Sequence, residues 1–470
     1  MGQVQFATQT FTDTALPVSS QRLVNLYAER CPPDAKTQVA VKGSPGVVSF
    51  GSCGSGPIRG FDYMGGVLYV VSGGYLYSMS STGSATLLGG VISGSGPVSL
   101  DNNGTQLVIV NGVHGYVYSV SAGFTVINDA DFNAAKTVRF LDQRFVFDWY
   151  GTNKFFISDT LDATSYDALA FASAESRPDN VLAVEVHQEI LLVFGDKTIE
   201  PHQNVGAANF PFERVPGGVI ERGLGAVYAI TQEDNTVFFL GEDRIFYKLS
   251  GSSISRISTH PLEHEWARYD VISDAVCFSY TFAGHKFIGI TFPTQSRTFQ
   301  YDIASGWLWH ERQSWDLNGN PMGLWRFFCV IDAYGKTLVG DAFSGAVGYL
   351  SDTTYTELGN TMQGLAVSPP IHHDRKRLFH AGFELDVESG VGIATGQGSD
   401  PQIMLDWSDD KGHTYTDQQI WSSMGAGGAY NTRLRWTRLG QSRDRRYRIT
   451  ISDPVPRTIM AAHADLMLGA

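Results

Sequence analysis

The chain has 470 residues, too many for one hydrophobic core, which favours two or three domains. Its formal net charge is -13, and an acidic surface of this kind repels phosphate, which disfavours tight general binding of nucleic acid. The sequence contains no run of 18 apolar residues and no basic segment followed by an apolar core at its start. We therefore expect no membrane insertion and no secretion signal, and a protein that stays in the cytoplasm where it is made or ends in a particle assembled there.

Short strands joined by tight turns are the expected building blocks. Glycine occurs 51 times, hydrophobic residues make up 43% of the chain and aromatic residues 12%. Valine, isoleucine, threonine, tyrosine and phenylalanine recur in short runs, which is typical of strands rather than of long helices. The four cysteines are far apart and form no CxxC pair: Cys31, Cys53, Cys277 and Cys329. The sequence predicts an all-β protein with free thiols.

Residues 1–56 contain few strong strand patterns and several breakers, including Pro32-Pro33 and Ser44-Pro45-Gly46. We interpret them as an extended N-terminal arm that packs on another surface.

A repeat begins after this arm and fills residues 57–360. Its unit is an apolar strand, a turn and a second apolar strand, as in Val67–Val71 followed by Tyr75–Met79. Later copies begin near residues 107, 144, 190, 237, 286 and 337. A spacing of roughly 37–49 residues is typical of the four-stranded blades of a β-propeller, in which stacking buries both faces of each small sheet.

The repeat predicts about seven blades, with six or eight as alternatives. A β-sandwich and a β-helix are the competing folds for such aromatic-rich repeats. A β-helix is disfavoured because its coils repeat over far fewer residues, and a sandwich of this length needs two or three domains.

Residues 365–470 have a different pattern. Polar and apolar residues alternate in segments such as Gly382–Val387, Gln402–Trp407 and Arg446–Ile451. Alternation with a period of two indicates sheets with one wet face. We predict a separate C-terminal β-sandwich here.

A turn in this domain resembles the Asp-box of sialidases and related proteins. It is carried by Ser408, Asp410, Gly412 and Tyr415, with tyrosine where tryptophan is common. In such a turn the aspartate binds backbone amides and the glycine takes a positive φ, so the expected role is structural.

Catalytic and metal-binding motifs are weak. His260 and His264 share the spacing of zinc ligands on a helix, but HExxH is absent, and we interpret them as part of an exposed helical insert between blades. His372-His373-Asp374 is equally weak as a metal motif. No GxGxxG, P-loop or GxSxG pattern occurs. We predict no catalytic, metal-binding or cofactor-binding residues and no cofactor.

Arginines concentrate near the C-terminus, against the acidic balance of the whole chain. This concentration indicates either a solvated strand face paired with local acids, or docking against an acidic partner subunit or DNA phosphate. The candidate interface residues are Arg433, Arg435, Arg438, Arg443, Arg445, Arg446 and Arg448, with Arg457 beyond them.

Several segments resemble the packaged-DNA stabilisation, or tail-hub, proteins of P22-like short-tailed phages. The most telling is 174–180, Ala-Glu-Ser-Arg-Pro-Asp-Asn, which leads into Phe194–Glu200. Gly151–Asn153 with Phe155–Asp159, and Leu23–Tyr27 with Ser44–Gly46, fit the same family. The resemblance spans the chain in order and length.

The resemblance implies a structural virion protein and not an enzyme. It implies a homo-oligomer, a hexameric ring below the portal and adaptor proteins, which seals the DNA exit channel after packaging and serves as a conduit during ejection. Its partners would be those rings, a tail needle, spikes or fibres, and genomic DNA that passes without sequence-specific binding. Two other functions fit a propeller with a sandwich: a sialidase-like tail depolymerase, and a non-catalytic receptor-binding tail module.

Overall fold

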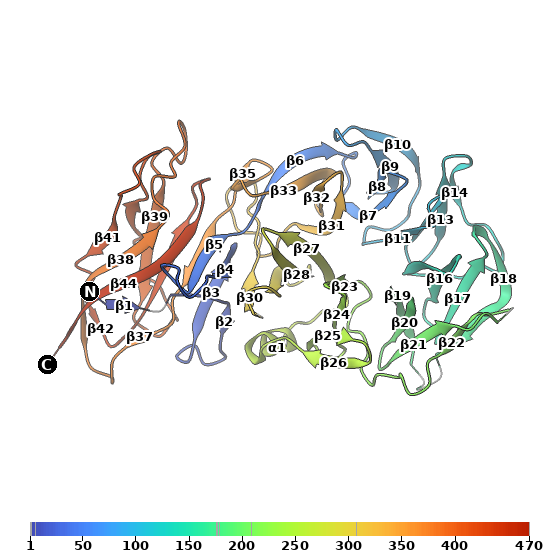
Figure 1. Ribbon diagram of the computed structural model, residues 1–470, viewed down its shortest axis with the longest axis horizontal. Coiled ribbons are helices and arrows are strands. Elements are labelled where there is room, and N and C mark those ends of the chain that lie inside the picture. The colour runs from blue at the N-terminus through green and yellow to red at the C-terminus, as the bar shows by residue number, and fades with distance from the viewer. Residues whose placement is uncertain are drawn as a thin grey trace.

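The computed structural model describes residues 2–4, 6–174, 177, 179–207, 209–306 and 308–469. It shows a ring of small sheets joined to a layered body that contains both chain ends (Figure 1). Strands dominate, and the described residues contain one helix, α1 (His260–Ala267). No helix among the described residues is long and apolar enough to cross a membrane.

Five four-stranded antiparallel sheets make up most of the ring, each with its first strand nearest the axis. The first two are β7 (Ile58–Met64), β8 (Val67–Ser72), β9 (Tyr75–Met79) and β10 (Ala85–Gly90), then β11 (Ser99–Asn102), β12 (Gln106–Val110), β13 (Gly115–Ser119) and β14 (Gly123–Val126). The third and fourth are β15 (Val138–Leu141), β16 (Arg144–Trp149), β17 (Lys154–Asp159) and β18 (Asp162–Ser173), then β19 (Val181–His187), β20 (Ile190–Gly195), β21 (Ile199–Asn204) and β22 (Phe212–Arg214). The fifth is β23 (Ile230–Glu233), β24 (Thr236–Leu240), β25 (Phe246–Ser250) and β26 (Ser253–Arg256).

Two further four-stranded units complete the ring within larger sheets. The strands β31 (Phe327–Ala333), β32 (Lys336–Asp341) and β33 (Ala346–Ser351) are closed by β6 (Gly46–Ser52), and β34 (Thr356–Glu357) and β35 (Asn360–Thr361) extend this sheet. The other unit is β27 (Val276–Phe282), β28 (His285–Phe292), β29 (Arg297–Asp302) and β30 (Leu308–Glu311). It continues by hydrogen bonding into the C-terminal domain.

Among the described residues, six sheets therefore belong to the propeller alone. The predicted count of about seven blades is one too high for separate propeller sheets. The reason is that the seventh four-stranded unit, β27–β30, is part of an eleven-stranded sheet that it shares with the second domain.

Apolar side chains on both faces of each blade explain why the ring forms. Val108 and Val110 of β12 pack against Phe145 and Phe147 of β16, and all four are buried. A blade buried on both faces has continuously apolar central strands rather than alternating ones. This is the pattern that the sequence repeats around the ring.

The C-terminal domain consists of two sheets with a shared core, to which Phe383, Trp436 and Tyr447 contribute. One sheet has the order β4 (Leu26–Arg30), β5 (Val39–Gly43), β44, β38 and β41, with β1 (Gly2–Val4) beside β44 and β42 beside β38. The other continues from β30 as β3 (Ser20–Val24), β36, β43, β39 and β40, with β2 (Phe11–Thr12) paired to β3 and β37 paired to β43. The late strands are β36 (Gly364–Val367), β37 (Ile371–His372), β38 (Leu378–Val387), β39 (Gln402–Ser408), β40 (Ile420–Ser423), β41 (Leu434–Thr437), β42 (Gln441–Ser442), β43 (Asp444–Ile451) and β44 (Thr458–Leu468).

The N-terminal segment, expected above as an extended arm, is divided between the two domains. Its strands are β1 (Gly2–Val4), β2 (Phe11–Thr12), β3 (Ser20–Val24), β4 (Leu26–Arg30), β5 (Val39–Gly43) and β6. β6 supplies the outer strand of the last blade, whereas β1, β4 and β5 pair within the C-terminal domain. β3 pairs with β30 at Val24 and Glu311 on one side and with β36 on the other. One strand therefore joins the ring to the sandwich.

Candidate functional site

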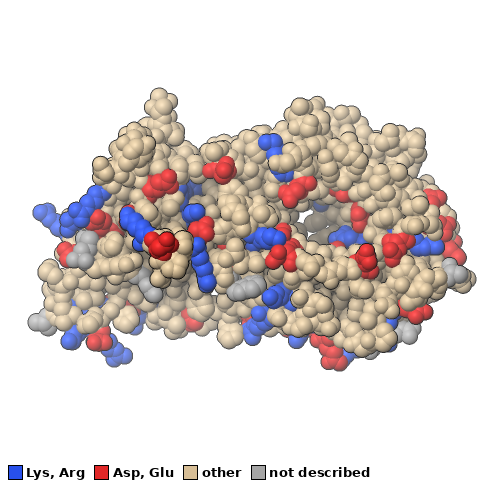
Figure 2. Space-filling view, in the orientation of Figure 1, with Lys and Arg blue, Asp and Glu red and all other residues tan. Residues whose placement is uncertain are grey.

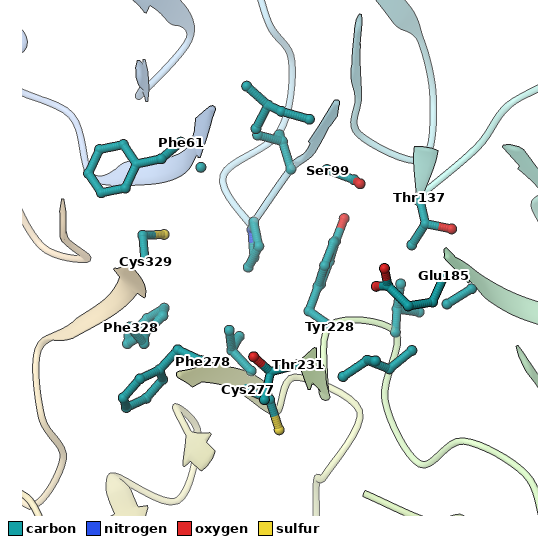
Figure 3. Close-up of a pocket in the computed structure, with 18 of the residues that line it drawn as sticks. Phe61, Ser99, Thr137, Glu185, Tyr228, Thr231, Cys277, Phe278, Phe328 and Cys329 are labelled. Atoms are coloured by element: carbon teal, nitrogen blue, oxygen red, sulfur yellow. The ribbon is translucent and has the colours of Figure 1, made fainter. Parts of the chain in front are cut away.

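The propeller axis is the first place to look for a site. The innermost strands of all the four-stranded units surround a cavity of about 270 Å³, which opens as a hollow in the face of the ring (Figure 2). Its wall is mixed, with polar groups such as Ser99, Thr231 and Glu185 beside apolar ones such as Phe61 and Phe278 (Figure 3).

Two charged groups in this wall, Arg139 and Glu185, are paired with each other. Arg139 donates to both carboxylate oxygens of Glu185, at 2.8 and 2.7 Å. The Gln232 amide donates to the same carboxylate at 2.9 Å. Burial alone would lower the pKa of Arg139, but the carboxylate of Glu185 outweighs it and raises the pKa. This pair is a closed unit within the wall.

Arg59 is also fully engaged. It is buried and donates to the carbonyls of Gly96 at 2.6 Å, Gly73 at 2.9 Å and Ser93 at 3.0 Å. A glycosidase of the sialidase type would need arginines that converge on a bound sugar acid. Both arginines in the described cavity wall, Arg59 and Arg139, already donate to groups of the protein itself. Their bonds stabilise the wall of the ring.

Two carboxyl groups near the axis have raised pKa values. Burial raises the pKa of Asp101 to about 6 and shifts the pKa of Asp62 in the same direction. Asp101 accepts the Phe140 amide at 2.7 Å, and Asp62 accepts the Asn102 side-chain amide at 2.9 Å. Asp101 therefore links β11 to β15, and Asp62 links β7 to β11, in each case across neighbouring blades.

The junction between ring and sandwich holds a denser network. Arg22 of β3 donates to both oxygens of Glu311 on β30, at 2.9 and 2.7 Å, and Arg297 lies 3.2 Å from the same carboxylate. Burial would raise the pKa of Glu311, but the two arginines outweigh it and hold the pKa at about 2. This ion cluster fixes β3 against the blade.

A second cluster lies beside the first. His285 is 2.8 Å from Asp302 and 3.0 Å from Glu29 of the N-terminal segment. Although burial lowers the pKa of His285, its two carboxylate neighbours raise it overall. Arg312 is fully buried over the ring of Trp325, 3.6 Å from Glu357. These contacts again join segments far apart in the sequence.

The C-terminal arginines do not form one surface. Arg445 is buried and binds both oxygens of Asp409 at 2.6 Å. Arg446 is buried as well and donates to Asp444 and to the carbonyls of Leu16 and Pro17. Internal bonding also holds Arg448, which pairs with Asp406, and the buried Arg457, which donates to the carbonyls of Tyr355, Met362 and Asp453.

The other candidate arginines are at the surface. Arg433 is exposed and pairs with Glu384. Arg435, Arg438 and Arg443 are exposed. These four are the exposed members of the set, whereas Arg445, Arg446 and Arg457 are buried and the half-buried Arg448 is paired with Asp406.

The Asp-box-like turn is held by its own side chains. Asp410 accepts the amide of Thr414 at 2.9 Å and that of His413 at 3.1 Å, and the Ser408 hydroxyl accepts the amide of Gly412 at 2.8 Å. The Thr414 hydroxyl and amide hold the pKa of Asp410 well below its usual range. Gly412 has a φ of 92°, and the Arg448 guanidinium lies 4.0 Å from the centre of the Tyr415 ring.

The histidine motifs have structural surroundings. α1 carries His260 and His264 but also buries Leu262 and Trp266 against the ring, so it is not simply exposed. His373 is exposed and 4.0 Å from Asp374. The described residues contain no group of three potential metal ligands. All four cysteines are free, and burial raises the pKa of the Cys53 thiol to about 12.

The segment 174–180 lies partly outside the described residues, which omit Glu175, Ser176 and Pro178. Its Asp179 accepts the amides of Lys197 and Thr198, at 3.0 and 2.9 Å. Asp148 likewise accepts the amides of Lys136 and Thr137, at 3.0 and 2.6 Å. The repeated Lys-Thr pair was the available sequence signal for these buried aspartates, which our sequence reasoning missed.

Fold and polar groups together define a class of protein. A propeller continuous with a β-sandwich, whose buried charged side chains bond mostly to groups of their own chain, has the architecture of a scaffold with many exposed loops.

Two family models match this chain. The model described as "Bacteriophage P22 Gp10, beta-propeller" matches residues 13–355, and the one described as "Bacteriophage P22 Gp10, beta-sandwich" matches residues 365–467. The chain belongs to the bacteriophage P22 Gp10 family. A curated relative, "Tail hub protein gp10" of Salmonella phage P22, is 25% identical over 415 residues, which is 83% of each chain.

Solved structures resemble the chain only distantly. The computationally designed Ika8 protein gives a TM-score of 0.40 at 12% identity and covers 70% of this chain and 100% of its own. The Pan2 WD40 domain of Neurospora crassa gives 0.42 at 7% identity and covers 65% and 95%. The N-terminal domain of Nup159 gives 0.41 at 12% identity and covers 71% and 99%.

Proposed function

We propose that this chain is a structural virion protein that forms the hub, or nozzle, of a phage tail. In this role it sits below the portal and adaptor rings as a hexamer, seals the DNA exit channel after packaging and serves as a conduit during ejection. The observation that carries the proposal is the family match across both domains, together with the tail hub protein among the relatives.

Stiffness of the molecule supports this role. A plug under DNA pressure must transmit force between its parts without bending. The shared strand β3 joins the two domains into one continuous sheet, and its half-buried Arg22 is paired with the buried Glu311 of the blade. The ring closes on β6, from the N-terminal segment, so the propeller cannot open without breaking the pairing of β6 with β33.

The charge of the protein also suits a conduit. With a formal net charge of -13, the surface does not hold DNA phosphate, so DNA would pass without sequence-specific binding. The exposed Arg433, Arg435, Arg438 and Arg443 are the candidate contacts for an acidic partner, such as an adaptor, needle, spike or fibre protein.

The copy number of the chain per particle tests the proposal. We would purify the phage that encodes it and quantify this chain against the major capsid protein by mass spectrometry. A sixfold ring requires about six copies per particle. A much larger multiple of three would favour a receptor-binding module or a depolymerase instead, and absence from the particle would reject the hub.

A further inference from the structure

Positive charge gathers at one end of the sandwich, although the formal net charge of the whole chain is -13. The turn that joins β37 to β38 has the sequence His372-His373-Asp374-Arg375-Lys376-Arg377, with three cations against one carboxylate. All six side chains are exposed. The turn is closed by the Lys376 amide, which donates to the His373 carbonyl at 2.8 Å. It therefore presents its three cations together.

A fourth cation lies beside this turn. The antiparallel strands β38 and β42 pair through Leu378 and Ser442, so the next residues on the two chains are Arg377 and Arg443. Blue side chains project at the lower left of Figure 2, where Figure 1 places β37 and β42. We call the following four residues the basic end: Arg375, Lys376, Arg377 and Arg443.

The charges of the basic end are not neutralised locally. None of its four side chains takes part in an ion pair or a side-chain hydrogen bond among the described residues, and all four are exposed. Elsewhere on the domain surface the exposed Arg433 pairs with Glu384. Asp444, which follows Arg443 in the chain, already pairs with Arg446. The positive potential of the basic end is therefore free to act on a partner.

Apolar side chains are exposed next to these cations. Phe379 is 41% exposed, Met467 55% and Leu468 52%. They are neighbours, because Phe379 is the cross-strand partner of Met467. The Gly469 amide donates to the Arg377 carbonyl at 2.7 Å, which fixes the end of β44 beside the turn. We call Phe379, Met467 and Leu468 the apolar edge.

The mixture of groups indicates the class of partner. Interfaces between proteins are enriched in arginine, phenylalanine and methionine and depleted of lysine. The basic end and the apolar edge together hold three arginines and one lysine beside Phe379 and Met467. DNA phosphate would use the cations but leave the apolar edge in water, and the acidic balance of the chain repels it. An acidic protein surface is attracted by the same cations and can also cover the apolar side chains.

We propose that the basic end and the apolar edge together bind an acidic segment of another virion protein. Carboxylates of that segment lie against the arginines, and an apolar side chain between them covers Phe379. The inference rests on the proposed function, because it names the chemistry of a partner that the tail hub holds. It moves the expected contact away from Arg433, whose charge is paired, to the turn 372–377 and the end of β44.

Photo-crosslinking tests the contact directly. We would place p-benzoylphenylalanine at Phe379 of the full chain in assembled phage particles, because this exchanges one aromatic ring for another. After irradiation, mass spectrometry identifies the crosslinked peptides. The expected product joins position 379 to a segment of a different virion protein in which aspartate and glutamate outnumber lysine and arginine. Tyr75 of the ring, 48% exposed, is the control position and should not crosslink to that segment.

Other products would overturn the inference. A crosslink from position 379 to DNA, to a second copy of this chain or to a segment without an excess of acids would assign the surface to that occupant. Particles that contain the chain but give no product at position 379 would show that no partner covers it. Absence of the chain from particles would instead reject the proposed function, and the inference with it.

Charge reversal gives an independent measurement. Arg377→Glu should lower the yield of the product from position 379 about tenfold or more, because it places a carboxylate against the carboxylates of the partner. Arg443→Glu, on a different segment, should repeat this loss. Lys411→Glu makes the same change of charge at an exposed turn of the same domain and should leave the yield unchanged. Circular dichroism of each variant would separate loss of contact from loss of fold, and unchanged yields with both arginine variants would contradict the proposal.

Discussion

The ring has one side almost without charges and one side that buries many. Blades β7–β10 and β11–β14 hold one charged residue between positions 63 and 128. Blade β27–β30, which meets the sandwich, buries Asp302, Glu311 and His310, and Arg312 lies directly after it. Both sides are built from the same four-stranded unit. The difference therefore does not follow from how a blade folds.

A buried ion pair contributes little net stability, but it can specify how two elements pack against each other. Removing two charges from water costs about as much as their attraction returns, but the pair is satisfied in one arrangement only. At the junction, Arg22 and Glu311 fit one register of β3 against β30. We infer that charges there define how the domains join.

Removal of one junction charge should have the largest effect. Arg312→Met would leave Glu357 buried near Trp325 without its cation, and breaking such a pair costs about 3–5 kcal/mol. The free energy of unfolding from denaturant titration, followed by tryptophan fluorescence, measures this loss. The exposed Arg433, paired with Glu384, is the matched control and should show no measurable change as Arg433→Met. Equal losses in both variants would contradict the difference between buried and exposed pairs.

Acid should weaken the junction through His310. Burial lowers its pKa to about 3, whereas an unfolded histidine titrates near 6.5. Below 6.5 the unfolded chain binds a proton that the folded chain refuses, so stability falls as the pH drops toward 3, by up to about 1.4 kcal/mol per pH unit. Stability measured against pH should lose part of this slope in His310→Gln.

A second buried histidine contributes to the pH dependence that remains in His310→Gln. Burial also lowers the pKa of His380, in the sandwich, to about 3, with the same sign. The exposed His413 serves as control, and His413→Gln should keep the full slope. A slope that His310→Gln leaves unchanged would show that His310 is already protonated in the folded chain.

The sequence was sufficient for the parts of the fold that depend on local pattern. The apolar strand pairs of the ring and the alternating strands after residue 365 predicted a propeller followed by a sandwich, and both family models agree. The shared sheet could not be predicted, because β3 pairs with β30 and β36, which lie hundreds of residues later in the sequence. No local pattern in Ser20–Val24 specifies those partners.

The arginines show the same limit for side chains. Arg445 and Arg446 are adjacent in the sequence, yet both are buried, since one binds Asp409 and the other the carbonyls of Leu16 and Pro17. Arginine is rarely buried without a partner, so composition favoured a surface cluster. Only the fold distinguishes these two from Arg435 and Arg443, which are exposed.

A smaller effect is expected from the one buried arginine that borders the charge-free blades. Arg59→Met removes donors from the carbonyls of Gly73, Ser93 and Gly96, and unpaired buried acceptors cost about 1–3 kcal/mol. Hydrogen exchange should rise in the linker 91–97. Arg144→Met, which loses a bond to the Ser158 carbonyl, is the control. If Arg59→Met lost as much stability as Arg312→Met, an arginine bonded to carbonyls would matter as much as one paired with a buried carboxylate, which contradicts this prediction.

The exposed turn in the sandwich should give the smallest effect. Asp410→Ala removes the acceptor for the amides of His413 and Thr414, and hydrogen bonds of this kind contribute about 0.5–1.5 kcal/mol each at most when water can replace them. Because these bonds hold the pKa of Asp410 low, the wild-type turn should lose the same stability as the pH falls through that low pKa. Thermal unfolding of Asp410→Ala, beside the exposed control Asp417→Ala, measures the loss. A loss as large as that of Arg312→Met would mean that this turn supports the domain junction, and exposure would then be a poor guide to which charges hold the two domains together.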